Sequence, residues 1–154
     1  DLHGRSDHVE LPRLIERVTW AQIRRDFLRL APFHFREVDE GQLNLSEAFY
    51  EAVDKAGMLA CFRVKKHHLI GYNLLLIMER PHTGEKVALC DAVYLLPRYR
   101  GCGYGQLLLF GVEEILKADG VVSVTYGVRP KRDFSGTLKR GGYSVTETHY
   151  IKRL

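Results

Sequence analysis

Three glycines that alternate with other residues, Gly101, Gly103 and Gly105, are the part of the chain whose spacing points most clearly to chemistry. They follow an apolar stretch that ends at Pro97, and they precede a leucine-rich stretch that begins near Tyr104. A strand, a glycine turn and the start of a helix in this order bring several backbone N–H groups to one point, at the positive end of the helix. Such a turn is suited to binding a phosphate or pyrophosphate group.

The spacing of these glycines excludes two common phosphate-binding turns. A Walker turn continues into Lys-Ser or Lys-Thr, which is absent after these glycines, so the sequence argues against a nucleotide kinase or phosphatase. A dinucleotide-binding turn needs G-x-G-x-x-G, whereas this chain has G-x-G-x-G. What remains is Arg100-x-x-Gly103-x-Gly105, preceded by Leu-Leu-Pro-Arg-Tyr at 95–99. This pattern resembles the acetyl-CoA signature of the GNAT N-acetyltransferase superfamily.

The resemblance implies that acetyl-CoA is the cofactor and that amides of the turn bind the pyrophosphate of CoA. In the superfamily, backbone groups of the strand before the turn bind the pantetheine arm and the acetyl oxygen. The positions carried over are Val93, Tyr94, Leu95, Arg100, Gly101, Cys102, Gly103, Tyr104, Gly105 and Gln106. For the three strand residues the alternative is a plain core strand, and both interpretations can hold because these residues would act through their backbone.

Asp91 is the candidate catalytic base. A carboxylate inside the otherwise apolar stretch 87–96 must be exposed, paired or functional. On a regular strand Asp91 shares a face with Val93 and Leu95, two and four residues further on. In superfamily members that acetylate diamines, a carboxylate at this spacing is the proposed base, so the resemblance implies that Asp91 takes the proton of the attacking amine. The alternatives are an ion-paired or solvent-facing Asp91, with Glu79 or a chain of waters as the base.

The sequence departs from the superfamily pattern at the general acid. Many GNAT enzymes have a Tyr in the last helix for this role, and Leu138 occupies that position here, while Lys131 replaces a partner Asn. Tyr126 and Ser135 are other possible donors, although each also fits a packed aromatic or a helix-start hydroxyl. Cys102 is predicted to be a small turn residue, because no His is placed to activate it. The departure leaves open a second interpretation, an acyl-CoA-binding or partner-binding module with little or no turnover.

The composition limits the classes of protein to which the chain can belong. We expect 154 residues to form one domain, with residues 1–7 disordered. A net charge of +4 is mild; it suits an anionic cofactor and gives no direct evidence for nucleic-acid binding. Three cysteines without CxxC spacing argue against a disulfide framework and a zinc site, so we expect no metal and a cytoplasmic location. No apolar stretch reaches the ~18 residues that span a bilayer.

The hydrophobic pattern predicts an α+β layered fold with the order β-α-α-β-β-β-α-β-α-β. The predicted strands are 14–18, 58–65, 68–80, 86–96, 121–128 and 143–152, and the predicted helices are 19–30, 46–57, 104–120 and 133–140. Thr19 and Gln22 predict a capping box, and Pro32 predicts the end of the first helix. The nearly all-apolar stretch 121–128 predicts a strand covered on both faces. The resemblance implies the same fold, a mostly antiparallel mixed sheet of about six to seven strands flanked by about four helices.

The two remaining expectations concern the acceptor and the origin of the chain. An acidic and aromatic stretch at 33–40 lies where the superfamily selects its acceptor, and it fits either a cationic amine or a solvated loop. Residues 132–135, 138–143 and 150–154 resemble small GNAT proteins encoded by bacteriophages, which implies a host bacterial cytoplasm. The acceptor is expected to be a primary amine of a protein or a small molecule. GNAT proteins are often homodimers, so a homodimer is a further expectation from the resemblance.

Overall fold

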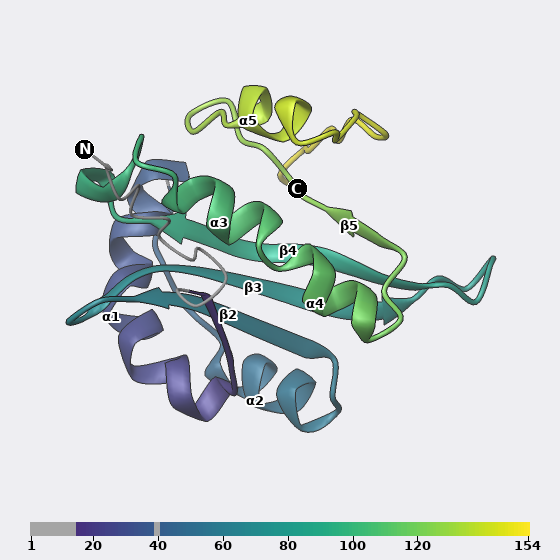
Figure 1. Cartoon of the computed structure of the whole chain (residues 1–154), viewed down its shortest axis with the longest axis horizontal. Helices are drawn as coiled ribbons and strands as arrows, with labels where there is room; N and C mark the ends of the chain where they lie inside the picture. The colour runs from purple at the N-terminus through teal and green to yellow at the C-terminus, as the bar shows by residue number, and fades with distance from the viewer. Residues whose placement is uncertain (1–14, 39–40) are drawn as a thin grey trace, which may run out of the picture.

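The computed structural model describes residues 15–38 and 41–154, and the predicted disorder of 1–7 lies outside these residues. Within them the chain forms one five-stranded sheet with the order β1-β2-β3-β4-β5 (Figure 1). The strands are β1 Ile15–Val18, β2 Leu59–Lys65, β3 Leu69–Glu79, β4 Lys86–Leu95 and β5 Ser123–Thr125. The first four pair antiparallel with their neighbours, and β5 runs parallel to β4. The predicted meander at residues 58–96 is therefore confirmed.

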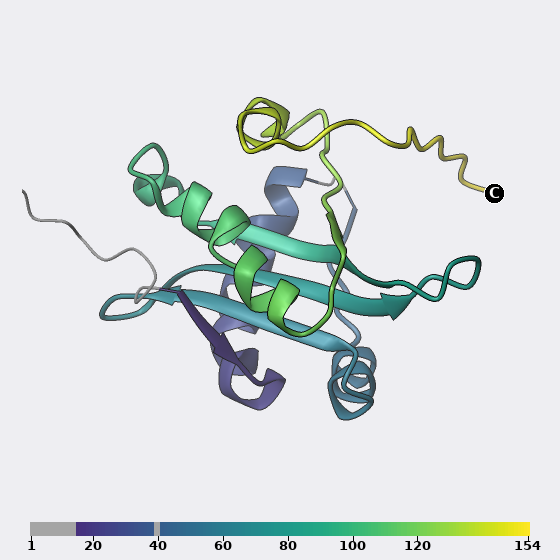
Figure 2. The same ribbon diagram turned by 45° about the vertical axis from the view of Figure 1, so that its right-hand side comes forward.

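Helices cover both faces of the sheet, as the predicted layers require (Figures 1 and 2). The helices are α1 Trp20–Val38, α2 Glu47–Lys55, α3 Tyr104–Phe110, α4 Glu113–Ala118 and α5 Ser135–Arg140. The first two pack on one face, and α3 and α4 pack on the other. None of the helices in the described ranges is long and apolar enough to cross a membrane. The α+β class is thus confirmed, with fewer strands than the six or seven expected.

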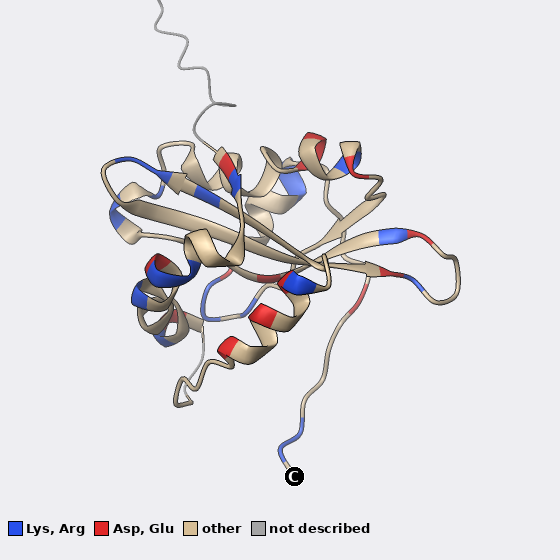
Figure 3. Cartoon of the chain, turned by 90° about the horizontal axis from the view of Figure 1, so that it is seen from below, with Lys and Arg blue, Asp and Glu red and all other residues tan. Residues whose placement is uncertain are grey.

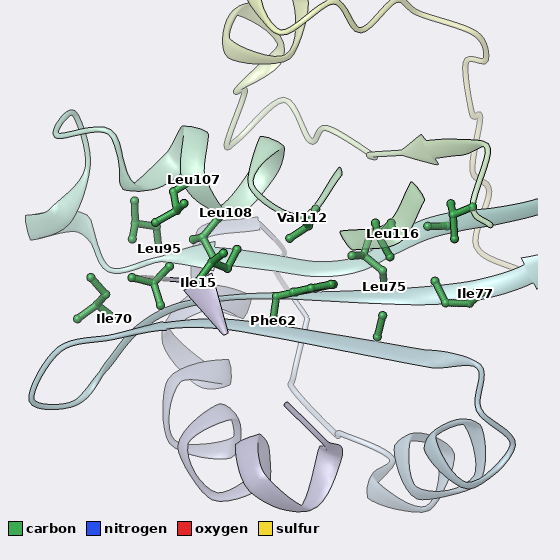
Figure 4. Packing of buried hydrophobic residues seen from close by; sticks show 14 residues of the cluster. Ile15, Phe62, Ile70, Leu75, Ile77, Leu95, Leu107, Leu108, Val112 and Leu116 are labelled. Atoms are coloured by element: carbon green, nitrogen blue, oxygen red, sulfur yellow. The ribbon is translucent and has the colours of Figure 1, made fainter. Parts of the chain in front are cut away.

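The two faces of the sheet have cores of different chemistry. Under α3 and α4 the buried side chains are almost all aliphatic, as Figure 4 shows for Leu108, Val112 and Leu116 above the strands. Under α1 and α2 the core is rich in aromatic rings, among them Trp20, Phe27, Tyr50, Tyr72 and Tyr94. Aromatic rings contribute a large buried area and, in Tyr, a hydroxyl that can form hydrogen bonds inside the core.

The start of α1 confirms one local prediction. The backbone N–H of Thr19 donates to Gln22 Oε1 at 2.9 Å, and the N–H of Gln22 donates to Thr19 Oγ1 at 3.2 Å. These reciprocal bonds form the capping box and satisfy donors that a helix start leaves unpaired. Ser46 likewise caps α2, accepting a hydrogen bond from the Phe49 N–H at 3.3 Å.

The prediction that Pro32 ends the first helix is wrong, since α1 continues to Val38. Proline removes one backbone donor from a helix, which disfavours continuation. Here the residues around Pro32 pack on the sheet: Ala31 is buried, and the His34 ring stacks on Tyr94 with ring centroids 4.9 Å apart. Tertiary packing therefore outweighs the lost hydrogen bond, and it places the last turns of α1 over the end of β4.

The predicted helix 104–120 is divided into α3 and α4 at Gly111 and Val112. Asn73, the one buried polar residue of the described chain, donates from Nδ2 to the Leu108 carbonyl at 2.9 Å and to Tyr126 Oη at 2.8 Å. Tyr126 Oη donates in turn to the Leu109 carbonyl at 3.2 Å. Side chains thus bond two carbonyls that a continuous helix would use, and this explains the interruption.

Two predictions for the C-terminal part are wrong. The strand expected at 121–128 contains only β5, and its Ser123 and Thr125 are exposed rather than covered on both faces. The strand expected at 143–152 is absent, and these residues form neither helix nor strand. A strand needs a partner to bond its backbone groups, and within the described ranges no strand pairs with the outer edge of β5.

Candidate functional site

Asp91 lies at a bulge in β4. Leu74 pairs with Ala92 and Leu75 pairs with Cys90, so Asp91 is an extra residue without a partner on β3. A bulge of this kind redirects a side chain and is over-represented beside active sites. Beyond the bulge the alternation of side chains restarts. The expectation that Asp91 shares a face with Val93 and Leu95 is therefore wrong: its carboxylate lies on the face that α1 and α2 cover.

Tyr50 of α2 holds the Asp91 carboxylate. Its hydroxyl donates to Asp91 Oδ2 at 2.7 Å. The Tyr50 ring is itself buried, stacked on Trp20 with centroids 4.7 Å apart and packed edge-on to Phe27 at 5.6 Å. Burial raises the pKa of Tyr50 above its usual range, and the hydrogen bond to the Asp91 carboxylate raises it further, so the hydroxyl remains a donor. Asp91 is exposed and held in one orientation.

A second polar pair lies on the same face, between Asp91 and the end of β4. His34 Nδ1 and the Tyr72 hydroxyl share a hydrogen bond of 2.8 Å, and His34 stacks on Tyr94. Burial lowers the pKa of His34 to about 4, an effect that Glu37 opposes and Arg100 reinforces. The imidazole is therefore neutral at pH 7. Together with Tyr50 and Asp91, these groups form a row of polar side chains set among aromatic rings.

The strand β4 separates from β5 where the cofactor-binding positions are predicted. The two strands pair from Val87–Ser123 to Leu89–Thr125 and no further. Residues 90–95 of β4 therefore have one edge outside any ladder of the described sheet. Tyr94 and Leu95 bury their side chains in the two cores, as a core strand would. Within the described residues the backbone of Val93–Leu95 pairs with no strand on the side of β5, so the core-strand and backbone-binding interpretations are compatible.

The turn between β4 and α3 has the backbone conformation that its glycines suggest. Gly101 and Gly103 have φ of +79° and +92°, which residues with side chains rarely adopt. Gly105 lies inside α3 and has no positive φ. A Cβ added at any of the three would meet nothing within 4 Å. The space beside the turn is open.

The amides of this turn are available to a ligand. Leu107 is the first residue of α3 whose backbone amide has a carbonyl partner. This amide donates to the Gly103 carbonyl in the turn at 3.1 Å. Among the described residues, none accepts a hydrogen bond from the amides of 101–106, and no side chain caps α3. Free amides and open space at the positive end of a helix fit an anionic group such as a pyrophosphate.

Arg100 fixes the position of the turn rather than extending into it. Its Nε donates to the Leu95 carbonyl at 2.9 Å, and its Nη2 donates to both Glu37 carboxylate oxygens at 3.0 and 2.8 Å. The guanidinium also lies 5.5 Å from the Tyr94 ring centroid. The C-terminal end of α1 is thereby tied to the end of β4. Positive charge beside the turn comes instead from Lys66, whose Nζ is 5.1 Å from the Tyr104 ring centroid.

The candidate acids are engaged in structural contacts. Leu138, at the position of the expected Tyr, is buried. The Tyr126 hydroxyl is bonded to Asn73 and Leu109, and burial raises its pKa far above the usual range. The Ser135 amide donates to Asp133 Oδ1 at 2.9 Å at the start of α5, which matches the helix-start interpretation. Glu79, the reserve base, is exposed at the end of β3, opposite Lys86.

The sequence did not identify Tyr50 and Tyr72 as partners of Asp91 and His34. Glu37 was noted only within the acidic stretch 33–40, and its role as the partner of Arg100 was missed. Their signal is weak, because hydroxyls and carboxylates are common on helices and strands alike, and only the folded chain shows which groups these side chains face. Within the described ranges, no group of three or more His, Cys, Asp or Glu is placed to bind a metal.

Comparisons with solved structures agree with this fold. The structure is similar to a ribosomal-protein-alanine N-acetyltransferase from Brucella melitensis biovar Abortus 2308, with a TM-score of 0.74 and 14% identity over 91% of this chain and 96% of that one. An aminoglycoside acetyltransferase from an uncultured soil metagenomic sample, in complex with sisomicin, gives 0.73 and 14% over 94% and 99%. Glucosamine-6-phosphate N-acetyltransferase from Arabidopsis thaliana gives 0.69 and 13% over 90% and 96%.

The sequence itself supplies the decisive match. No curated protein has a significantly similar sequence. The family model described as acetyltransferase (GNAT) family, however, matches residues 20–134, which is more than half of the chain. This range includes α1, the bulged strand β4 and the glycine turn. The chain therefore belongs to the acetyltransferase (GNAT) family.

Proposed function

We propose that this protein transfers an acetyl group from acetyl-CoA to a primary amine, with Asp91 as the base. Acyltransferases of the GNAT family generally use acetyl-CoA. The proposal depends on two features at either end of one stretch of chain. A bulge at 91 redirects a carboxylate, and an amine acceptor needs such a base. The amides of 101–106 have no partner in the described residues, and an anionic carrier needs such donors.

The turn and the open edge of β4 would hold the cofactor. Amides from Gly101 to Gln106 would bind the pyrophosphate, while the Arg100–Glu37 ion pair keeps the turn in place. Backbone groups of Val93, Tyr94 and Leu95 would bind the pantetheine arm and the acetyl oxygen, where negative charge develops during transfer. When bound, acetyl-CoA supplies an acetyl thioester that the amine attacks.

Asp91 would take the proton that the ammonium group loses as it becomes a nucleophile. Its carboxylate is exposed, so an amine can reach it, and Tyr50 fixes one of its oxygens. The other oxygen stays available to the amine. Since Leu138 and Tyr126 offer no free hydroxyl, the CoA thiolate would leave without a side-chain acid. A thiolate is a tolerable leaving group, so this lowers the rate without excluding the reaction.

The acceptor is an amine on a protein or a small molecule. The structural relatives carry names that include a ribosomal protein, aminoglycosides and a sugar phosphate, so one fold serves both classes. The exposed Asp91 carboxylate favours a cationic amine. The resemblance to phage-encoded GNAT proteins stays a prediction, and it favours a host or phage protein as acceptor.

Thiol release from acetyl-CoA, measured against amines, polyamines and peptides, tests the proposal. Asp91→Asn keeps the shape of the side chain and removes the base, so kcat should fall by about 10²–10⁴-fold, with unchanged affinity for CoA. Glu79→Gln, an exposed carboxylate on the neighbouring strand, is the matched control and should leave kcat unchanged. CoA binding without thiol release from any acceptor, in the native chain, would instead identify a binding module without turnover.

Two glycines of the turn provide a matched test of cofactor binding. Gly103→Ala makes the left-handed conformation of the turn cost roughly 1–2 kcal/mol, so the free turn should relax to another conformation. Binding must restore the original turn, so the Kd for CoA should rise about tenfold. Gly105→Ala adds the same methyl group in a helical conformation with open space around it, so its Kd should change little. Equal effects of the two substitutions in a calorimetric titration would contradict the assigned turn.

A further inference from the structure

The exposed face of helix α1 carries three arginines and an aromatic ring. Arg25, Arg29, Phe33 and Arg36 are all exposed, and at about 3.6 residues per turn they lie within about 80° of the helix circumference. The opposite face of α1 packs on the sheet. These four residues, which we call the arginine stripe, extend over ~16 Å, because the first and last are eleven positions apart at ~1.5 Å each.

The arginine stripe is positively charged, although the net charge of the whole chain is only +4. Among the residues that the structure describes, no carboxylate forms an ion pair with Arg25 or Arg36. Arg29 has Asp26 at 3.6 Å, and such a pair at the protein surface contributes little. Three arginines and one aspartate give this face of α1 a charge of +2.

The neighbouring helix α2 neutralises a different arginine of α1. Arg24 Nη2 lies 2.6 Å from Glu47 Oε1 of α2. Both helices face the viewer in Figure 3, which is seen from below; Lys and Arg predominate on α1, and Asp and Glu predominate on α2. The arginine that meets α2 is thus paired, whereas the arginines of the stripe remain available to a ligand.

The arginine stripe also offers a ring on which a flat group can stack. Phe33 is 52% exposed, and the guanidinium carbon of Arg36 lies 5.4 Å from its ring centroid. An exposed aromatic ring with an arginine beside it suits the π-face of a nucleic-acid base. The planar fork of arginine binds two phosphate oxygens at once, and α1 contains no lysine, which would act as a point charge. Both features favour a ligand with phosphates and bases.

The C-terminal end of the stripe adjoins the candidate site. The residue after Phe33 is His34, whose ring stacks on Tyr94 of β4 with centroids 4.9 Å apart. The residue after Arg36 binds Arg100, beside the glycine turn. A ligand that lies along the stripe therefore extends toward the candidate site.

We propose that the arginine stripe binds a single strand of RNA or DNA. The arginines bind phosphates along the strand, and Phe33 stacks on an unpaired base. At ~3.4 Å or more per nucleotide, a stripe of ~16 Å accommodates up to about five nucleotides. A duplex fits less well, because its bases are already paired and stacked on one another. An acidic peptide would use the arginines but leave Phe33 without a base to stack on.

Fluorescence anisotropy of a labelled twelve-nucleotide oligouridylate, titrated with the full-length protein, tests the proposal. Binding should have a Kd of about 1–100 µM at 0.1 M salt. The slope of log K against log salt concentration should be about −2, the value for three phosphate contacts on a single strand. Oligothymidylate should bind within a fewfold, since the stripe reads phosphates and base faces. A duplex of the same length should bind at least about tenfold more weakly.

Two kinds of variant separate the charge of the stripe from its ring. Arg25→Gln with Arg29→Gln removes two phosphate contacts, so the Kd should rise at least about tenfold and the salt slope should become less steep by about 1.4. Phe33→Ala should raise the Kd about fivefold or more with an unchanged salt slope, because it removes stacking alone. Lys139→Gln with Arg140→Gln, two charges on α5, is the matched control and should leave the Kd within twofold. All these positions are exposed, so the variants should fold normally by circular dichroism.

The absence of binding at 200 µM protein in 50 mM salt would overturn the proposal. So would equal losses in the α5 control and in the stripe variants, which would indicate a general effect of charge. Loss of binding in 1 mM CoA would assign the oligonucleotide to the glycine turn, and equal binding of the duplex would contradict stacking on Phe33. Tighter binding to an acidic peptide or to vesicles of anionic lipid would assign the stripe to a different partner and would also contradict the proposal. None of these readouts depends on acetyl transfer.

Discussion

The two faces of the sheet bury different kinds of side chain. Under α3 and α4 the packing is aliphatic, with Asn73 as the only buried polar residue among those described. Under α1 and α2 the rings of Trp20, Phe27 and three tyrosines dominate. The hydroxyls of two of these tyrosines, Tyr50 and Tyr72, bond Asp91 and His34. The tyrosine hydroxyls of the aromatic core orient the polar groups of the candidate site, whereas Asn73 in the aliphatic core bonds the backbone of α3. The aliphatic face contributes stability, and the aromatic face positions the candidate chemistry.

The largest effect should come from the aliphatic face and appear in stability alone. Leu116 of α4 is 1% exposed, and Leu116→Ala should reduce the free energy of unfolding by about 2–5 kcal/mol through lost burial and a cavity. Activity per folded molecule should be unchanged, since Leu116 lies away from Asp91 and the turn. Urea unfolding with active-site titration measures both quantities. Met78→Ala, at a half-exposed position, should cost far less.

A smaller effect, in rate alone, should come from the aromatic face. Tyr50→Phe keeps the ring stack on Trp20 and removes the hydroxyl that holds Asp91, so kcat should fall about three- to tenfold. The KM for the acceptor and the Kd for CoA should stay within twofold. Tyr72→Phe, which removes a hydroxyl bonded to His34 rather than to Asp91, is the matched control. A larger loss in the control would mean that Tyr50 does not position the base.

The smallest expected effect is a change in how stability depends on pH. The folded-state pKa of His34 is about 4, below its ordinary 6.5, so the unfolded chain binds more protons between these values. Stability is therefore fully present above about pH 6.5 and is lost as the pH falls toward 4. His34→Phe should flatten this part of the curve, measured as urea midpoints at pH 7 and pH 5. An unchanged slope would show that His34 titrates normally.

Local sequence signals predicted most of the elements but not where they end or divide. The Thr19–Gln22 capping box and the strands around 58–96 depend on neighbours in sequence, so pattern alone identified them. The continuation of α1 past Pro32 depends on His34 packing against Tyr94. The division of α3 from α4 depends on Asn73, some 35 residues away from the helix that it bonds. Such long-range contacts cannot be inferred from periodicity.

In the site, too, some features follow from local sequence and others depend on long-range contacts. The glycine turn was predictable because positive φ requires glycine at two fixed positions, Gly101 and Gly103. The residue type at position 91 was also informative, because a carboxylate is unusual in an apolar strand. Its face was not predictable, because one extra residue at the bulge reverses the alternation. The hydrogen bond from Tyr50 to Asp91 could not be predicted, because it forms only when the bulge directs Asp91 toward α2.

Amide chemical shifts of residues 101–106, followed by ¹H–¹⁵N NMR during a titration with CoA, show whether the glycine turn binds the cofactor. Gly101, Gly103 and Gly105 should show large, saturable shifts at the same CoA concentrations that saturate calorimetric binding. Amides of residues 144–154 serve as the internal reference and should move little. Saturable binding that leaves the three glycine amides unmoved would contradict cofactor binding at this turn, and so would the absence of any binding.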